Sequence, residues 1–319
     1  MTEEEQESSV LDHHFLARVF RSPVNATREG TKHYSKALST WLDIDDNTSK
    51  EIRTQEKLLR DLIGEKKARV EIFALMGSGK TTLMYFLRQS TDGSCVPELP
   101  DNDDILPHVC GDKELFESRY KDLREARNAI PPLLKLLYDE TMFRMAASTI
   151  QAAYLLLRDD VRIVYEEHTS KGLFIHDGTA ASERFNFSEA YHQIEIGGLK
   201  VITEEQMKII HTRFEQSFGK TPETRPHAII NFTASPDIAF KGVQYRDRPV
   251  ERSVKGRGIE QSYLEMLYPH AIKTPERLQK YGYAGSIITL NRNDIHIPHR
   301  PQDYITVLQQ VRQGLEGRI

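Results

Sequence analysis

Short apolar runs alternate with longer helical patterns over most of the chain. The run at residues 68–73 is rich in β-branched and aromatic residues and stops at a glycine-rich turn, which is the pattern of a buried strand. Three further runs of this kind end at a break, at residues 172–176, 227–232 and 286–290. Another strand is expected to end next to Glu98, so the sequence predicts five strands.

Helical patterns fill the intervals between these strands. They are clearest at residues 82–87, 133–158 and 204–218, where apolar residues recur at helical spacing. An alternation of strands and helices favours a parallel sheet that is covered on both faces and has right-handed crossovers. We therefore expect an α/β fold with a five-stranded parallel sheet flanked by helices.

Residues 1–66 are more polar and carry no candidate chemistry. Their clearest helical pattern lies at residues 50–62, where Ile52, Leu58, Leu59 and Leu62 could form one apolar face. We interpret residues 1–66 as an N-terminal helical or partly disordered extension that packs on the main domain or on a partner. Residues 67–319 are expected to form the main domain.

Composition narrows the class of protein. The chain has 319 residues, with 43 basic against 47 acidic ones, so no overall positive field is available to hold a nucleic acid. Its two cysteines, Cys95 and Cys110, are too few for a disulfide framework and give no metal-ligand spacing. The twelve histidines show no metal-ligand spacing either, and we expect them on the surface.

The first twenty residues and the later apolar runs predict neither a secretory signal nor a membrane span. It opens with Glu3, Glu4 and Glu5, and no later apolar run reaches the length of a membrane span. We expect a cytoplasmic protein that binds neither a membrane nor a nucleic acid. The sequence leaves the oligomeric state open, with a homodimer as one alternative.

A glycine-rich loop between the first strand and the first helix is the most specific motif. It runs from Ala74 to Thr82 as Ala-Leu-Met-Gly-Ser-Gly-Lys-Thr-Thr. In a phosphate-binding loop (P-loop), glycines let backbone N–H groups turn inward onto phosphate oxygens, a lysine reaches the β and γ phosphates, and a threonine hydroxyl binds Mg²⁺. The fold is then expected to be a P-loop kinase fold that takes ATP and Mg²⁺. The expected nucleotide-binding residues are Gly77, Ser78, Gly79, Lys80, Thr81 and Thr82, with Thr81 on the metal and Lys80 also a catalytic residue.

Ala74 departs from this motif, which has glycine at its first position. If the loop required a positive φ there, alanine would cost on the order of 1 kcal/mol. A folded loop can absorb such a penalty.

Polar residues suited to a ligand site follow further along the chain. Glu98 and Asp177 each stand at or just after the expected carboxyl end of a strand, where open α/β sheets bind their ligands. Gln151 and Arg158 lie seven residues apart on a helical pattern, which places them on one face two turns apart.

With these motifs in this order, residues 68 to about 312 resemble the deoxynucleoside kinase family. The resemblance is carried by the P-loop, Glu98, the Gln151 and Arg158 pair, Asp177-Gly178-Thr179, and a basic segment followed by Tyr263-Leu264-Glu265. It implies that Glu98 acts as the base on the sugar 5′-hydroxyl, and that Gln151 and Arg158 read the nucleobase.

The same resemblance assigns the remaining site residues. Glu183 matches a further acidic position that helps to read the base, and we expect Asp177 next to the Mg²⁺ ion. An arginine-rich lid at about residues 246–258 is expected to close over the phosphates. Its candidate arginines are Arg246, Arg248 and Arg252, the first two as catalytic residues.

One residue departs from the family pattern at a functional position. Gly178 stands where the family has an arginine that contacts the phosphoryl region and the 5′ end of the substrate. Arg184 could replace it from the next turn and is our candidate substrate contact. This departure leaves open a catalytically weak member of the family.

The expected function is therefore an ATP-dependent kinase that transfers the γ-phosphoryl group to the 5′-hydroxyl of a deoxynucleoside. Two alternatives remain. One is a nucleoside monophosphate kinase of the thymidylate type, which would need arginines for an acceptor phosphate. The other is a catalytically weak NTP-binding regulatory protein.

Overall fold

A parallel five-stranded sheet forms the centre of the molecule. The computed structural model describes residues 9–22, 26–96, 171–177, 183–196, 198–218, 225–246 and 260–319. The strand order is β2-β3-β1-β6-β7, and every neighbouring pair is parallel. The strands are β1 (Lys67–Ala74), β2 (Ser94–Val96), β3 (Gly172–Asp177), β6 (Ala228–Thr233) and β7 (Ser286–Asn291). The predicted five-stranded parallel α/β fold is confirmed.

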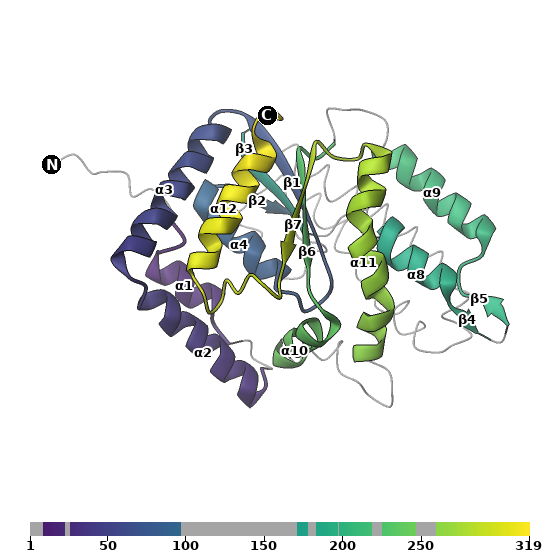
Figure 1. The fold of residues 1–319 in the computed structure, drawn as a ribbon, viewed down its shortest axis with the longest axis horizontal. Coiled ribbons are helices and arrows are strands. Elements are labelled where there is room, and N and C mark those ends of the chain that lie inside the picture. The colour runs from purple at the N-terminus through teal and green to yellow at the C-terminus, as the bar shows by residue number, and fades with distance from the viewer. Residues whose placement is uncertain are drawn as a thin grey trace, which may run out of the picture.

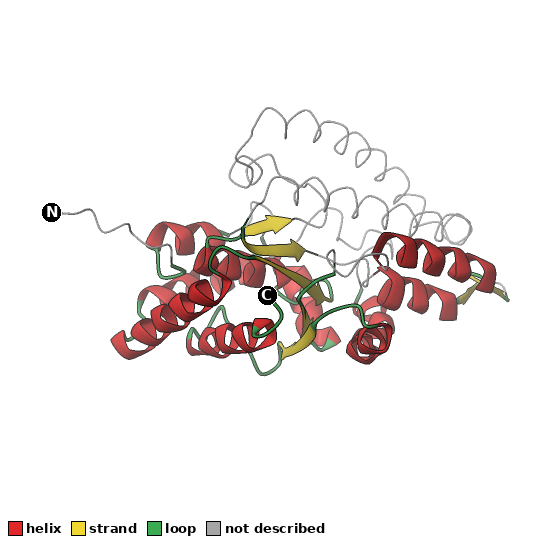
Figure 2. Cartoon of the chain, turned by 90° about the horizontal axis from the view of Figure 1, so that it is seen from above, coloured by secondary structure: helices red, strands yellow, loops and turns green. Residues whose placement is uncertain are grey.

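Helices cover both faces of this sheet (Figure 1). One face carries α1 (His13–Val19), α2 (Arg28–Leu42), α3 (Asp46–Ile63), α4 (Lys80–Thr91) and α12 (Gln302–Leu315). The other carries η2 (Glu183–Phe187), α8 (Ser188–Gln193), α9 (Glu204–Phe218), α10 (Pro236–Arg246) and α11 (Gln261–Tyr281). A small antiparallel pair, β4 (Glu195–Ile196) and β5 (Leu199–Lys200), lies beyond α8. Figure 2 shows the two helical layers on either side of the strands.

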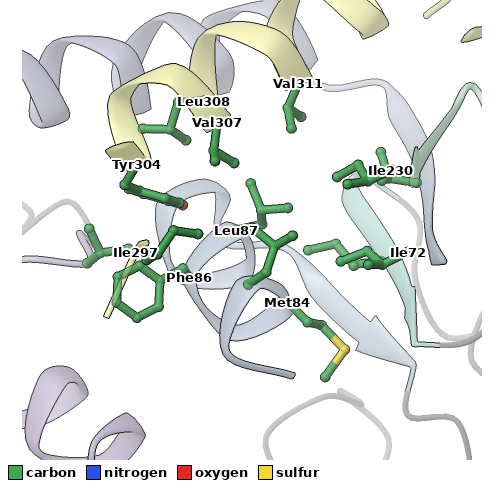
Figure 3. Close-up of a cluster of buried hydrophobic side chains, with 14 of the residues drawn as sticks. Ile72, Met84, Phe86, Leu87, Ile230, Ile297, Tyr304, Val307, Leu308 and Val311 are labelled. Atoms are coloured by element: carbon green, nitrogen blue, oxygen red, sulfur yellow. The ribbon is translucent and has the colours of Figure 1, made fainter. Parts of the chain in front are cut away.

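The central strand β1 supplies both hydrophobic cores because successive side chains of a strand point to opposite faces. Val70 and Ile72 belong to the core under α4 and α12, whereas Phe73 belongs to the core under α10 and α11. In the first core, Leu87 of α4 lies between the strand residues Ile72 and Ile230 and the side chains of α12 (Figure 3). A strand buried on both faces reads as a nearly continuous apolar run, which is why residues 68–73 were recognisable.

The N-terminal helices share the first core with the sheet. Trp41 of α2 packs edge-on against Phe86 of α4, with ring centroids 4.8 Å apart. In α3 the buried apolar face consists of Ile52, Leu59 and Ile63. The predicted apolar face was wrong at Leu58, which is 40% exposed. The helix turns the side of Ile52, Leu59 and Ile63 towards the core, and Leu58 lies outside that side. The boundary near residue 66 stays a prediction.

Most predicted elements agree with the described ones. The helical pattern at 204–218 coincides with α9, and the strand expected before Glu98 is β2. The pattern at 133–158 lies outside the described residues. Among the residues that the structure describes, no helix is both long and apolar enough to span a membrane.

Candidate nucleotide site

The P-loop connects β1 to α4 at the carboxyl edge of the sheet. β1 ends at Ala74 and α4 begins at Lys80. Gly77 and Gly79 have φ angles of 80° and 95°, a left-handed conformation that residues with a Cβ rarely adopt. The two glycines are therefore required by the backbone of this loop.

Ala74 does not need such a conformation. It is the last residue of β1 and pairs with Phe232 of β6. Within the described parts of the chain, Asp92 is the only residue other than glycine with a positive φ. Alanine at position 74 therefore carries no strain energy from a positive φ angle. The positive φ angles of this loop are at Gly77 and Gly79.

The loop also lies in direct backbone contact with α10. A Cβ on Gly77 would stand 1.9 Å from the carbonyl oxygen of Ala239, and a Cβ on Gly242 would stand 2.0 Å from the carbonyl oxygen of Gly77. Both distances are far below van der Waals contact. Glycine at both positions lets α10 support the loop from one side.

The start of α4 offers hydrogen-bond donors to an anion. The first N–H groups of a helix have no acceptor within the helix, and the N-cap Gly79 has no side chain to supply one. The hydroxyl oxygen of Ser78 is buried and has no hydrogen-bond partner. Lys80 and Thr81 stand in the same turn and are half-buried. These groups fit a phosphate chain, whose oxygens accept hydrogen bonds and whose charge is favoured at a helix N-terminus.

The strand order places this loop at the switch point of the sheet. From β1 the chain continues into α4 on one face, whereas from β6, the neighbour of β1, it continues into α10 on the other face. Ligands of open α/β sheets bind in the crevice at such a point. Asp177, the last residue of β3, is in register with Ile72 of β1, so its backbone lies at the same carboxyl edge. The Mg²⁺ site of Thr81 and Asp177 stays a prediction.

Several predicted site residues lie outside the described residues, and their roles stay predictions. They are Glu98, Gln151, Arg158, Arg248 and Arg252. Arg246, the first lid arginine, is the last residue of α10 and is half-buried. It therefore ends the helix that touches the P-loop.

Arg184 is held inside the second core rather than extended towards solvent. It is 8% exposed, its Nη1 donates to Glu189 at 2.6 Å, and its guanidinium lies over the ring of Phe185 at 5.2 Å. Glu183 precedes it as the first residue of η2. To contact a substrate, Arg184 would have to share its guanidinium with Glu189, and this role stays a prediction.

Arg292 also lies beside the P-loop, a position that the sequence pattern did not predict. Its Nε lies 3.8 Å from the position that a Cβ on Gly79 would take. Its Nη1 donates to the carbonyl oxygen of Ile295 and to Nδ1 of His296, both at 2.8 Å. Burial, and next the charge of Arg300, lower the pKa of Arg292 to about 10, so the residue remains a cation at neutral pH. The sequence did contain one signal for this residue, because Arg292 directly follows β7 at the carboxyl edge of the sheet, where ligands bind.

The histidines also differ from the expectation that they lie on the surface. His176 of β3 and His270 of α11 are each 6% exposed. The prediction was wrong for these two because β3 is buried along residues 173–176, His176 included, and His270 lies on the buried stripe of α11. Burial lowers the pKa of His270.

A glycine-rich loop between the central parallel strand and a helix whose N-terminus lacks a side-chain cap defines a P-loop nucleotide-binding protein. The family model for deoxynucleoside kinases matches residues 71–315. The chain therefore belongs to the deoxynucleoside kinase family, a class of nucleotide-binding transferases. A search of curated proteins finds no match to the chain.

Proposed function

We propose that this protein transfers the γ-phosphoryl group of ATP to the 5′-hydroxyl of a deoxynucleoside. The observation that carries the proposal is the P-loop at the switch point, with its uncapped helix N-terminus and the buried, unpaired hydroxyl of Ser78. These groups favour a phosphate chain as ligand. Family membership favours a nucleoside as acceptor.

In the proposed reaction the described residues hold the donor. Lys80 and the first N–H groups of α4 bind the β and γ phosphates. Thr81 and Asp177 would hold Mg²⁺, which neutralises charge on the phosphates when bound. Phosphoryl transfer depends mostly on positioning and on electrostatic stabilisation, and this loop is suited to both.

The acceptor side rests on residues assigned through the family. Glu98 removes the proton of the 5′-hydroxyl while the 5′-oxygen of the nucleoside bonds to the γ-phosphorus of ATP. The bond between the γ-phosphorus and the leaving ADP breaks in the same step. Gln151, Arg158 and Glu183 read the nucleobase. The lid arginines Arg246, Arg248 and Arg252 close over the phosphates, where they exclude water and stabilise developing charge.

An ADP-release assay with mass spectrometry of the product tests this proposal. Purified protein receives Mg²⁺ and ATP with each deoxynucleoside in turn, and with the corresponding monophosphates as competing acceptors. We expect a deoxynucleoside 5′-monophosphate as product. A diphosphate made only from a monophosphate acceptor would instead support the thymidylate-type alternative. ATP binding without any transfer would support the regulatory one.

A further inference from the structure

Helix α2 lies in the N-terminal segment, where the sequence offers no candidate chemistry. This helix contacts two other segments, and each of them reaches the P-loop. The first is the end of α10, where Tyr245 and Arg246 lead into the expected lid. The second is the loop of residues 292–301 after β7, which begins with Arg292.

Helix α2 contacts the end of α10 through backbone atoms and through an aromatic ring. A Cβ on Gly30 would stand 2.3 Å from the carbonyl oxygen of Tyr245, so glycine is needed for this close approach. The backbone N–H of Thr27, the N-cap of α2, donates to the same oxygen at 3.4 Å. The ring of His33 stacks on that of Tyr245, with centroids 4.7 Å apart and planes 30° apart.

The contact with the 292–301 loop uses two hydrogen bonds. Nδ1 of His33 and Nε2 of His299 are 2.9 Å apart, and the indole N–H of Trp41 donates to the carbonyl oxygen of Ile297 at 2.9 Å. Burial and neighbouring charges lower the pKa of both His33 and His299, so two neutral rings share this bond at neutral pH. In such a pair one ring nitrogen donates and the other accepts.

His33 thus touches both segments at once. Through Tyr245 it contacts the helix whose Gly242 lies against Gly77. Through His299 it contacts the loop whose Arg292 lies beside Gly79. The two connections end at Gly77 and Gly79, the P-loop glycines with a left-handed backbone. A small displacement there changes the direction of the N–H groups that face the phosphates in the proposed function.

We propose that α2 is part of the scaffold of the donor-nucleotide site, and that His33 and Gly30 are positioning residues for ATP. The inference rests on the proposed function for its link to catalysis. It assigns a role to α2, which holds the end of α10 and the 292–301 loop in register with the P-loop.

The test uses full-length protein with His33→Ala, His33→Asn and Gly30→Ala. Asparagine places a polar atom near the position of Nδ1 and can replace the hydrogen bond to His299. The matched control is Ser35→Ala on the exposed face of the same helix. Each variant is measured for the Kd of Mg²⁺-ATP by calorimetry, the KM for ATP, the KM for the best deoxynucleoside, and the thermal midpoint.

We expect His33→Ala to raise the Kd and KM for ATP by about 3- to 10-fold, the range set by losing one hydrogen bond. The KM for the deoxynucleoside should stay within about twofold, and His33→Asn should recover most of the loss. Gly30→Ala should raise the Kd for ATP at least as much, because a backbone contact must shift. Ser35→Ala should match the wild type.

Two outcomes would overturn the inference. In one, His33→Ala binds ATP as tightly as Ser35→Ala does. In the other, it lowers the thermal midpoint and weakens both substrates equally, which is what a merely structural residue would do. A failure of the proposed function gives a different result, since wild-type protein would then bind ATP but transfer no phosphoryl group. The Kd for ATP of His33→Ala, compared with that of Ser35→Ala, would still decide the role of α2. Wild-type protein that binds no ATP would end both proposals.

Discussion

Gly77 of the P-loop and Gly242 of α10 meet through their backbones, and a Cβ on Gly242 would stand 2.0 Å from the carbonyl oxygen of Gly77. The helix that ends at Arg246, the first arginine of the expected lid, is thus in contact with the proposed phosphate-binding loop. We expect a displacement of α10 to shift the loop, because the two backbones are in direct contact. This relationship makes the first prediction specific.

Gly242→Ala should weaken ATP binding at least about tenfold, although alanine normally favours a helix interior by about 1 kcal/mol over glycine. The clash must move either α10 or the P-loop, at a typical cost of about 1–3 kcal/mol. ATP affinity and urea unfolding measure the two effects. Gln244→Ala, exposed on the same helix, is the control. A Gly242→Ala protein that is more stable than wild type and binds ATP normally would refute the contact.

A second prediction concerns the buried carboxyl group of Glu56 in α3. It accepts hydrogen bonds from Ser9 Oγ at 2.6 Å, from the backbone N–H of Val10 at 2.9 Å and from Ser90 Oγ at 2.9 Å. Ser90 Oγ is also 2.7 Å from the hydroxyl of Tyr304. The network joins the N-terminal segment to the helix that starts at the P-loop.

Glu56→Gln should lower the free energy of unfolding by about 1–3 kcal/mol, because the amide points a donor at other donors inside the core. Equilibrium urea unfolding measures this loss. Asp61→Asn on the exposed side of α3 should change stability by less than about 0.5 kcal/mol. Equal stability of the two variants would show that the network contributes nothing.

A third prediction concerns acid stability. Burial, followed by the charges of His299, Arg292 and His296, lowers the pKa of His33 from 6.5 to about 4. Burial first, and then neighbouring cations, also lower the pKa of His296 and His299, with Arg292 and then Arg300 acting on His296, and Lys36 acting on His299. Asp303 opposes the shift at His296. These rings are more easily protonated in the unfolded chain than in the folded one.

Their contribution to stability is therefore complete above about pH 6.5 and is lost as the pH falls towards about 4. The titration of His33 alone should lower the free energy of unfolding by about 1 kcal/mol as the pH falls from about 7 to about 5.5, after allowance for solvent screening. Burial raises the pKa of Glu56, which acts in the opposite direction and offsets part of the loss. Unfolding at several pH values tests the sign, and a His33→Asn protein should show a flatter dependence. An unchanged slope in that variant would exclude His33 as a cause.

The parts of this account that the sequence predicted are local ones. The strand at residues 68–73 and the glycine-rich loop after it are each visible within one short window. Arg292 was missed because its neighbour Gly79 is more than two hundred positions away, and His33 because its hydrogen-bond partner His299 is 266 positions away. Leu58 was misplaced because both it and Leu59 suit an apolar face, and only packing against the sheet decides between them. Long-range contacts leave no periodic signal in one sequence.

A fourth prediction concerns the choice of acceptor. Gln151→Ala should raise the KM for the best deoxynucleoside at least about tenfold, the factor that corresponds to 1.4 kcal/mol, because a buried polar group on the base would lose its partner. The KM for ATP should remain nearly unchanged. Steady-state kinetics with each substrate varied in turn provide the test. A large change in the KM for ATP alone would remove Gln151 from the acceptor site.

The most direct test of the central claim is the deoxynucleoside-dependent formation of ADP by wild-type protein and by Lys80→Ala, measured side by side. Lys80 stands in the first turn of α4, directly after Gly79. We expect the wild type to release ADP only when a deoxynucleoside is present, and Lys80→Ala to lose at least about 100-fold in kcat while circular dichroism shows the same fold. Equal turnover by the two proteins would contradict the claim that this loop transfers the phosphoryl group.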